Sequence, residues 1–138
     1  MYLLDTNVVS ELRKVRAGRA DRGVAAWAEG VEAADLFLSV VTVHEIELGV
    51  QMAERRDPRQ GGVLRGWLEQ GLLPAFSGRV LPVDTAVARR SAALHVPDRR
   101  PLADSFIAAT ALVHGLVVVS RNMADFAPMG VACLNPWG

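Results

Sequence analysis

The sequence predicts an α/β domain in which a mainly parallel sheet of about five strands is covered by helices on both faces. Short, wholly apolar runs alternate with segments of helical periodicity, and no internal repeat or low-complexity segment breaks this alternation. Strands without a polar face are typical of parallel sheets that are buried on both sides. The 138 residues, 51% of them hydrophobic, suffice for one core, so we expect a single domain over residues 1–138.

The expected strands are the short apolar and β-branched runs, in chain order residues 2–4, 36–41, 80–83, 116–120 and 131–134. The expected helices cover residues 8–12, 24–34, 42–56, 62–71, 84–95 and 102–114. Asp57-Pro58 ends the third helix, Asp84 caps the fifth and Gly115 ends the sixth. The basic, glycine-containing residues 13–23 are expected to form a loop.

Composition narrows the class of protein. The 15 basic and 15 acidic residues cancel, so the net charge favours neither a nucleic acid nor a membrane surface as partner. Lys14 is the only lysine; the arginines suit phosphate recognition, although codon preference in a GC-rich genome explains such a bias equally well. The single cysteine, Cys133, permits no internal disulfide and indicates a reducing cytoplasm. No apolar run approaches the ~20 residues of a membrane span.

Polar residues follow several of the expected strands. Asp5 ends the first strand, and Ser120, Arg121 and Asn122 follow the fourth. Ligands of open α/β sheets bind beyond the carboxyl ends of the strands, so these residues are candidates for a site. Asp5 is equally suited to cap the helix that follows it.

Glu45 is the second candidate acid. At 100° per residue it shares a helical stripe with Leu48, Gly49 and Met52, which we expect to face the sheet, whereas Glu47 lies opposite as a solvated acid. The spacing of Thr42 and Glu45 also matches a capping box, in which Glu45 would only reach back to the start of the helix.

Asp104 is the third candidate acid. It lies in the first turn of its helix, on the stripe formed by apolar side chains that we expect to be buried, Ile107, Ala108, Ala111 and Leu112. The helix dipole favours an acid there by only ~0.3–1 kcal/mol and does not explain its place on the buried face. Three inward acids must be neutralised, either by arginines or by a hard divalent cation. A site with oxygen ligands alone favours Mg²⁺ or Mn²⁺.

Four stretches of the chain resemble the PIN-domain ribonucleases, and within them the VapC-type toxins of bacterial toxin–antitoxin pairs. In chain order they are LLDTNVVSEL, SVVTVHEIELG, PLADSFIAATALVHG and VVVSRNMADF. The resemblance implies a PIN-like three-layer α/β/α sandwich over nearly the whole chain. It also implies an acidic cluster that binds Mg²⁺ or Mn²⁺ and hydrolyses RNA to products with 5′-phosphate and 3′-hydroxyl ends.

The resemblance assigns roles to individual residues. Asp5, Glu45 and Asp104 match the first three acids of the family, as catalytic residues and metal ligands. The fourth position falls in SRNMADF, where Asp125 is the only carboxylate and Asn122 takes the earlier position. Thr6, Ser120 and Asn122 are expected to support the acids. Candidate RNA contacts are basic residues, Arg13, Lys14, Arg16, Arg19, Arg22 and Arg121, each of which is also an ordinary surface residue.

The resemblance further implies partners: RNA, a small VapB-type antitoxin and a second copy of the chain in a homodimer. We expect the antitoxin groove near the hairpin of residues 42–75. The aromatic residues Trp27, Trp67, Trp137 and Phe76 are candidates for these contacts or for the core. The alternative function is a catalytically inactive PIN-fold module that binds RNA or protein. A haloacid-type phosphatase is excluded because no aspartate stands two residues after Asp5, and a receiver domain because Lys14 is misplaced.

Overall fold

The computed structural model describes residues 1–138 and contains one sheet of five strands. The strands are β1 (Tyr2–Leu4), β2 (Leu36–Ser39), β3 (Val80–Leu81), β4 (Val117–Val119) and β5 (Cys133–Leu134). Their order is β3-β2-β1-β4-β5 and every pair is parallel, so β1 lies at the centre. The chain builds outward from β1 to β3 and then crosses back to β4, which makes the boundary of β1 and β4 the point where the strand order reverses.

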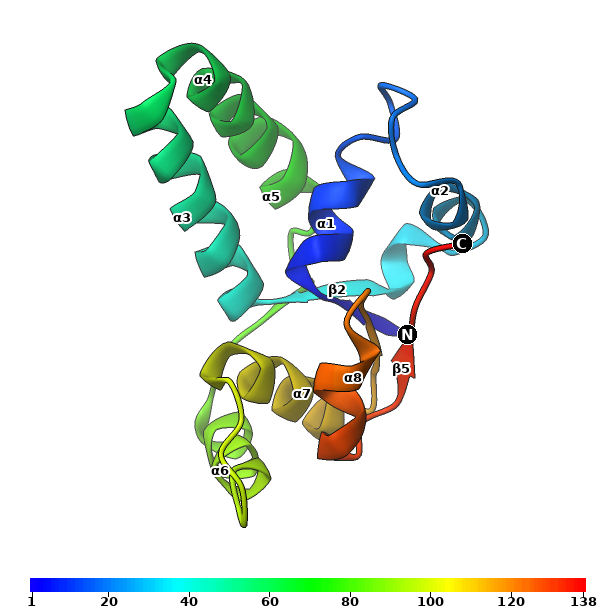
Figure 1. Cartoon of the computed structure of the whole chain (residues 1–138), viewed down its shortest axis with the longest axis vertical. Helices are drawn as coiled ribbons and strands as arrows, with labels where there is room; N and C mark the ends of the chain where they lie inside the picture. The colour runs from blue at the N-terminus through cyan, green and yellow to red at the C-terminus, as the bar shows by residue number, and fades with distance from the viewer.

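The helices cover both faces of the sheet (Figure 1). They are α1 (Thr6–Leu12), α2 (Arg22–Glu29), α3 (Val40–Arg56), α4 (Pro58–Gly66), α5 (Leu73–Ala75), α6 (Thr85–Leu94), α7 (Leu102–His114) and α8 (Met123–Phe126). A π-helical segment over Trp67–Leu72 joins α4 to α5 without a break, and short 3₁₀ turns cover Ala33–Asp35 and Ala127–Met129.

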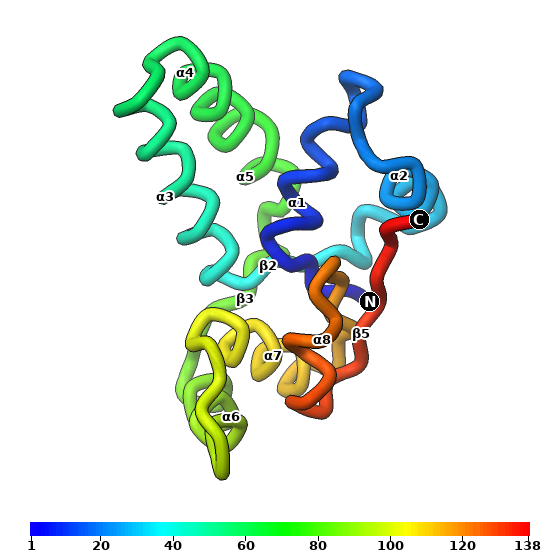
Figure 2. The backbone as a smooth tube through the Cα atoms, in the orientation of Figure 1, coloured from blue at the N-terminus to red at the C-terminus, as the bar shows by residue number.

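Alternation along the strands divides the core into two layers. Leu4 packs with Val8, Ile46 and Phe76 on the face covered by α1 and the α3–α5 hairpin. Its neighbour Leu3 packs with side chains of α7 and α8 on the other face. Successive residues of a strand point to opposite faces, so a strand of three residues contributes to both layers. Figure 2 shows α1 and the α3–α5 hairpin on one side of the sheet and α6, α7 and α8 on the other. The expected α/β sandwich with a parallel sheet is therefore confirmed.

Several predicted boundaries were wrong. The third helix begins at Val40, capped by Ser39, so the second strand ends two residues earlier than residues 36–41 predicted. The helix expected over 24–34 ends at Glu29, where Gly30 follows, and the helix expected over 62–71 starts at Pro58 because Asp57 caps it. The short helix α8 was not anticipated.

The predicted inward face of α3 was also wrong. Its buried side chains are Thr42, Ile46, Val50 and Ala53. Leu48 and Met52, expected to face the sheet, are 49% and 57% exposed. The helix carries two apolar stripes, and only one of them lies against the core.

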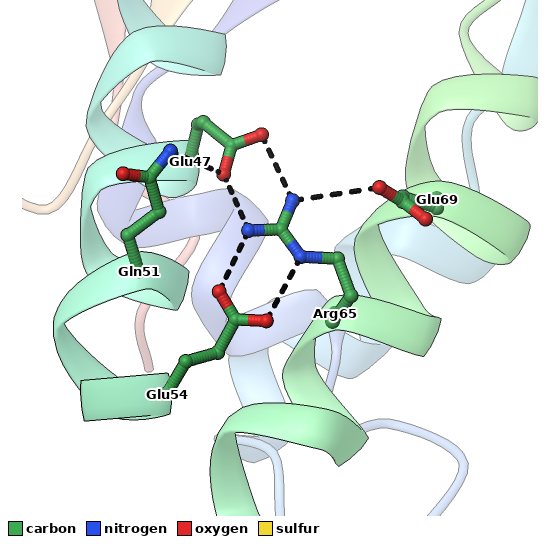
Figure 3. A network of polar contacts seen from close by, with 5 residues as sticks. All are labelled: Glu47, Gln51, Glu54, Arg65 and Glu69. Carbon is green, nitrogen blue, oxygen red and sulfur yellow. Dashed lines mark hydrogen bonds and ion pairs between the residues drawn. The ribbon is translucent and has the colours of Figure 1, made fainter. Parts of the chain in front are cut away.

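An arginine joins α3 to α4. Arg65 donates to Glu47 from Nη1 at 2.9 Å and to Glu54 from Nη2 at 2.8 Å, and Glu69 lies 3.5 Å from Nη1 (Figure 3). Glu47, expected to be a solvated acid, is thus ion-paired across the hairpin. Gly61 allows this close approach, since a Cβ there would lie 2.3 Å from Cα of Glu54.

No helix combines the length and the apolar character that crossing a membrane would require.

Candidate active site

Acidic side chains gather at the carboxyl edge of the sheet, where β1 and β4 end. Asp5 directly follows β1 and is 7% exposed. Its backbone N–H donates to the carbonyl of Val119 at 2.9 Å, which fixes the ends of the two central strands side by side. The edge lies at the reversal of strand order, the position at which open α/β sheets bind their ligands.

The Asp5 carboxylate has two sets of partners. Oδ1 accepts a hydrogen bond from the backbone N–H of Thr6 at 2.8 Å, so Asp5 does cap α1. Oδ2 accepts from the hydroxyl of Ser120 at 2.8 Å and from Nδ2 of Asn7 at 3.4 Å. Burial nevertheless raises the pKa of Asp5 above its ordinary value, against the effect of these hydrogen bonds. The cap and the candidate site are therefore the same side chain.

Glu45 faces this edge from α3. Its Oε1 accepts a hydrogen bond from the hydroxyl of Thr6 at 2.6 Å. Because α3 starts at Val40, Glu45 lies beyond the capping-box position and Thr42 is not the cap, so the capping-box alternative was wrong. The hydrogen bond from Thr6, the neighbour of Asp5 in the chain, holds the Glu45 carboxylate near Asp5.

Asp104 and Asp125 complete the group. Burial, followed by the charges of Asp5, Asp125 and Glu45, raises the pKa of Asp104 to about 6. Asp104 lies in the first turn of α7, and Asp125 lies exposed on α8. The charge of Asp125 also raises the pKa of Asp5, after burial and Glu45. The fold therefore brings the four predicted acids into one electrostatic cluster, called here the edge cluster.

The edge cluster has no cationic partner. The ion pairs of the molecule all involve Lys14 or Arg65, and none involves Asp5, Glu45, Asp104 or Asp125. No three of its carboxylates converge into a closed metal cage. Mg²⁺ does not need such a cage, because it binds through one or two carboxylates and keeps several waters for exchange with a substrate phosphate. An open, oxygen-only site of uncompensated charge fits a hydrated hard cation of this kind.

A polar loop supports the edge cluster from β4. Ser120 is fully buried; its hydroxyl donates to Asp5 and accepts from the backbone N–H of Asn122 at 2.9 Å. Asn7 was missed as a site residue. Its Nδ2 donates toward Asp5 and its Oδ1 accepts from the backbone N–H of Arg121 at 3.3 Å. The signal was an amide two residues after a strand-ending acid, which looks like a helix cap when taken alone.

The basic residues predicted to contact RNA fall in two places. Arg13 and Arg16 line a groove of about 460 Å³ between α1 and the segment over Trp67–Leu72, and the guanidinium of Arg13 lies 5.8 Å from the centroid of Trp67. Arg121 is exposed on the loop after β4, 5.4 Å from the centroid of Trp137. Of the four aromatic residues singled out from the sequence, Phe76 is buried and the three tryptophans are half-buried.

Known proteins resemble the chain over its whole length. The model of the PIN domain family matches residues 2–128. Toxin FitB of Neisseria gonorrhoeae is 41% identical over 99% of both chains, and VapC ribonuclease Y4jK of Sinorhizobium fredii is 37% identical over 99% of this chain and 98% of its own. The crystal structure of FitAcB from Neisseria gonorrhoeae superposes with a TM-score of 0.89 at 38% identity, covering 99% of both chains. The chain therefore belongs to the PIN domain family, among members named as VapC-type ribonucleases and toxins.

Proposed function

We propose that this protein is an Mg²⁺- or Mn²⁺-dependent endoribonuclease that acts as the toxin of a toxin–antitoxin pair. The observation that carries the proposal is the edge cluster, four acids at the reversal of strand order with no cationic side chain to neutralise them. The names of the relatives support RNA as the substrate and a toxin as the biological role. The single cysteine agrees with a reducing cytoplasm as the place of action.

The residues of the edge cluster have separate roles in this proposal. Asp5, Glu45 and Asp104 would hold the hydrated cation, one or two of them as direct ligands, with Asp125 as the fourth carboxylate and Asn122 as the alternative at that position. When bound, the cation would supply Lewis-acid stabilisation of the charge that develops on the phosphodiester. Hydrogen bonds from Ser120 and Thr6 orient the carboxylates of Asp5 and Glu45, as supporting donors commonly do at metal sites.

Asp104 is the candidate general base. In the metal-free cluster the pKa of Asp104 is raised to about 6, so its carboxylate is still ionised at neutral pH and able to accept a proton. One of its carboxylate oxygens would accept the proton of the water that attacks phosphorus. The hydrogen bonds of His95 go to Ser105 and Arg100, and no histidine is hydrogen-bonded to an acid of the edge cluster, so we assign no role to a histidine.

The test is cleavage of mixed cellular RNA by purified, antitoxin-free protein, with Mg²⁺, with Mn²⁺ and with EDTA. We expect metal-dependent cutting that is lost in Asp5→Asn and Asp104→Asn and retained in Glu29→Gln, which changes an exposed acid of α2. Products should carry 5′-phosphate ends. Folded wild-type protein that binds RNA but cuts none with either metal would favour the alternative, an inactive PIN-fold binding module.

The groove beside α1 is the place we propose for a VapB-type antitoxin. Its walls are mainly apolar, with Leu12 and Leu72 among them, and Arg13 and Arg16 lie at its rim. A segment with apolar side chains and an acidic residue would suit this lining. The groove lies beside the last residues of the hairpin over 42–75, where the antitoxin groove was predicted from the sequence. We expect crosslinks from the antitoxin to map to Leu12 and Gln70; a map confined to α6 and α7 would exclude the groove.

The uncovered stripe of α3 is the surface we propose for the homodimer. Val40, Leu48 and Met52 are exposed on it, and an apolar cavity of about 490 Å³ opens between Val40 and Leu102. Exposed apolar patches of this kind mark association surfaces. Analytical ultracentrifugation should give a dimer for the wild type and a monomer for Leu48→Glu. An unchanged dimer would place the interface elsewhere.

A further inference from the structure

Arg121 lies on the loop that supports the edge cluster. Its backbone N–H donates to Asn7, and the preceding residue, Ser120, donates to Asp5. Its guanidinium lies over the ring of Trp137, 5.4 Å from the centroid. The backbone of Arg121 thus belongs to the loop that supports the cluster, whereas its guanidinium lies at the start of α2, where its charge lowers the pKa of Asp21, and pairs with no carboxylate of the cluster.

Backbone hydrogen bonds of the C-terminal residues hold Trp137 in the position for this stacking. The backbone N–H of Trp137 donates to Oδ1 of Asn135 at 2.9 Å, and that of Gly138 donates to Oδ2 of Asp21 at 3.3 Å. Gly23 lies against this segment so closely that a Cβ would come within 2.5 Å of the Pro136 carbonyl oxygen. The segment is therefore fixed to the start of α2, and Trp137 is held in place by the backbone.

A second arginine–aromatic pair shows what a purely structural contact looks like. Arg79 lies 4.9 Å from the centroid of Phe76, and its guanidinium donates to three backbone carbonyls, those of Ala33, Leu36 and Ala75. The guanidinium of Arg121 makes no hydrogen bond and no ion pair. Its charge contributes to the lowered pKa of Asp21 without a direct contact. Stacking on an indole face leaves the edge donors of a guanidinium free for a phosphate.

We propose that Arg121 binds a phosphate of a single-stranded RNA where the strand leaves the edge cluster towards the start of α2, and that Trp137 is the positioning residue that holds Arg121 for this contact. The proposal rests on the proposed ribonuclease function. Four acids repel an RNA strand, and the net charge of the chain is zero, so a local cation is needed at the site. An arginine combined with an aromatic ring is a common element of single-strand binding. The groove proposed for the antitoxin contains neither residue.

The test measures binding separately from cleavage. In the Asp5→Asn background, with EDTA present, a fluorescein-labelled single-stranded RNA of mixed sequence is titrated by anisotropy at several salt concentrations. Arg121→Gln should weaken binding about fivefold to tenfold and reduce the slope of log K against log salt by about 0.7, the value for one phosphate contact on a single strand. Trp137→Leu should produce most of the same loss, and Trp137→Phe should restore binding. Arg89→Gln, an exposed arginine of α6, is the matched control and should change neither quantity.

A double variant separates positioning from structure. Trp137→Leu should add nothing to Arg121→Gln if Trp137 acts through Arg121. Additive losses, or an unchanged salt slope in Arg121→Gln, would overturn the proposal. With the cluster intact, Arg121→Gln should raise KM and leave kcat unchanged. A wild type that binds RNA with this arginine dependence but cuts none would contradict the proposed ribonuclease and leave this contact standing.

Discussion

Two groups of acids in this molecule have opposite electrostatics. In the α3–α4 hairpin, Glu47, Glu54 and Glu69 surround Arg65, whose hydrogen bonds lower the pKa of Glu47 and Glu54 below their ordinary values (Figure 3). In the edge cluster, burial and mutual repulsion raise the pKa of Asp5 and Asp104. The hairpin pairs its acids with a cation of its own chain, whereas we propose that the edge cluster takes its cation from solution.

The difference shows why an acidic group alone does not identify a metal site. Both groups draw acids from separate elements, and both include acids of α3. Only the edge cluster combines burial, uncompensated charge and a position where parallel strands end at a reversal of their order. Mutating one acid of each group should therefore have different effects on cleavage, on stability and on cation binding.

The largest expected effect is on cleavage. Asp104→Asn should lower kcat by at least ~100-fold, because it removes a metal ligand and the candidate base together. Glu47→Gln should leave kcat within about twofold, since Glu47 belongs to the hairpin group. Initial rates on one RNA substrate with Mn²⁺ measure both. Equal losses in the two variants would mean that the groups are not functionally distinct.

The next effect is on stability. Arg65→Gln removes the cation of the hairpin group and leaves Glu47 and Glu54 of α3 and Glu69 of the segment over Trp67–Leu72 without their ion-pair partner. We expect the Tm to fall by a few degrees and most of the loss to disappear at high salt, which screens exposed charges. Thermal melts at low and high salt, with Arg89→Gln as control, provide the measurement. A salt-independent loss would point to packing instead of charge.

A pH effect distinguishes the two groups without mutation. The folded-state pKa of Asp104, about 6, exceeds its ordinary value of 3.8, so the folded protein binds the extra proton between these values. The contribution of Asp104 to the stability of the metal-free protein should therefore decline as pH rises through this window, and the decline should be complete above pH 6. Protons compete with the cation, so Mg²⁺ affinity should be about tenfold weaker at pH 5 than at pH 7.5.

Thermal melts from pH 4 to pH 8, with and without Mg²⁺, measure both trends. Acids with a lowered pKa, among them Glu47 and Glu54, add stability over the same window in both proteins, so the wild-type curve is compared with that of Asp104→Asn. The difference between the two metal-free curves should fall from pH 4 to pH 6, and Asp104→Asn should abolish most of the stabilisation by Mg²⁺. A difference that does not fall would show that the charge of Asp104 is compensated inside the protein.

The smallest predicted effect concerns the hydrogen bond between Thr6 and Glu45. Thr6→Val removes the donor at 2.6 Å from Oε1 of Glu45 and keeps the shape of the side chain. We expect cleavage to fall about threefold to tenfold, in line with the net value of about 0.5–1.5 kcal/mol for a typical hydrogen bond. Thr6→Ser should retain activity. If Thr6→Val is fully active, Glu45 does not depend on this bond.

The sequence was sufficient to place Asp5 and Asp104. Each follows directly from a short apolar strand or a clear helix start, so its position along the chain determines its place at the sheet edge. Glu45 was placed at that edge by an argument that was wrong, because Leu48 and Met52 lie on an exposed stripe. A helix with two apolar stripes does not reveal from sequence alone which of them meets the sheet.

Contacts between elements distant in sequence could not be predicted. The ion pairs of Arg65 depend on the angle of the hairpin, and Asn7 contacts a residue 114 positions away. The stacking of Arg121 on Trp137 depends equally on where the chain end returns to α2. Such pairs have no spacing rule, because the topology of the whole sheet determines them.

Mn²⁺ binding at pH 7.5 tests the edge cluster itself and is measured by electron paramagnetic resonance on the wild type, Asp5→Asn, Asp104→Asn and Glu47→Gln. We expect the wild type and Glu47→Gln to bind Mn²⁺ alike and both aspartate variants to lose at least ~10-fold in affinity. A wild type that binds no Mn²⁺, or aspartate variants that bind as well as the wild type, would contradict the claim that the edge cluster takes its cation from solution.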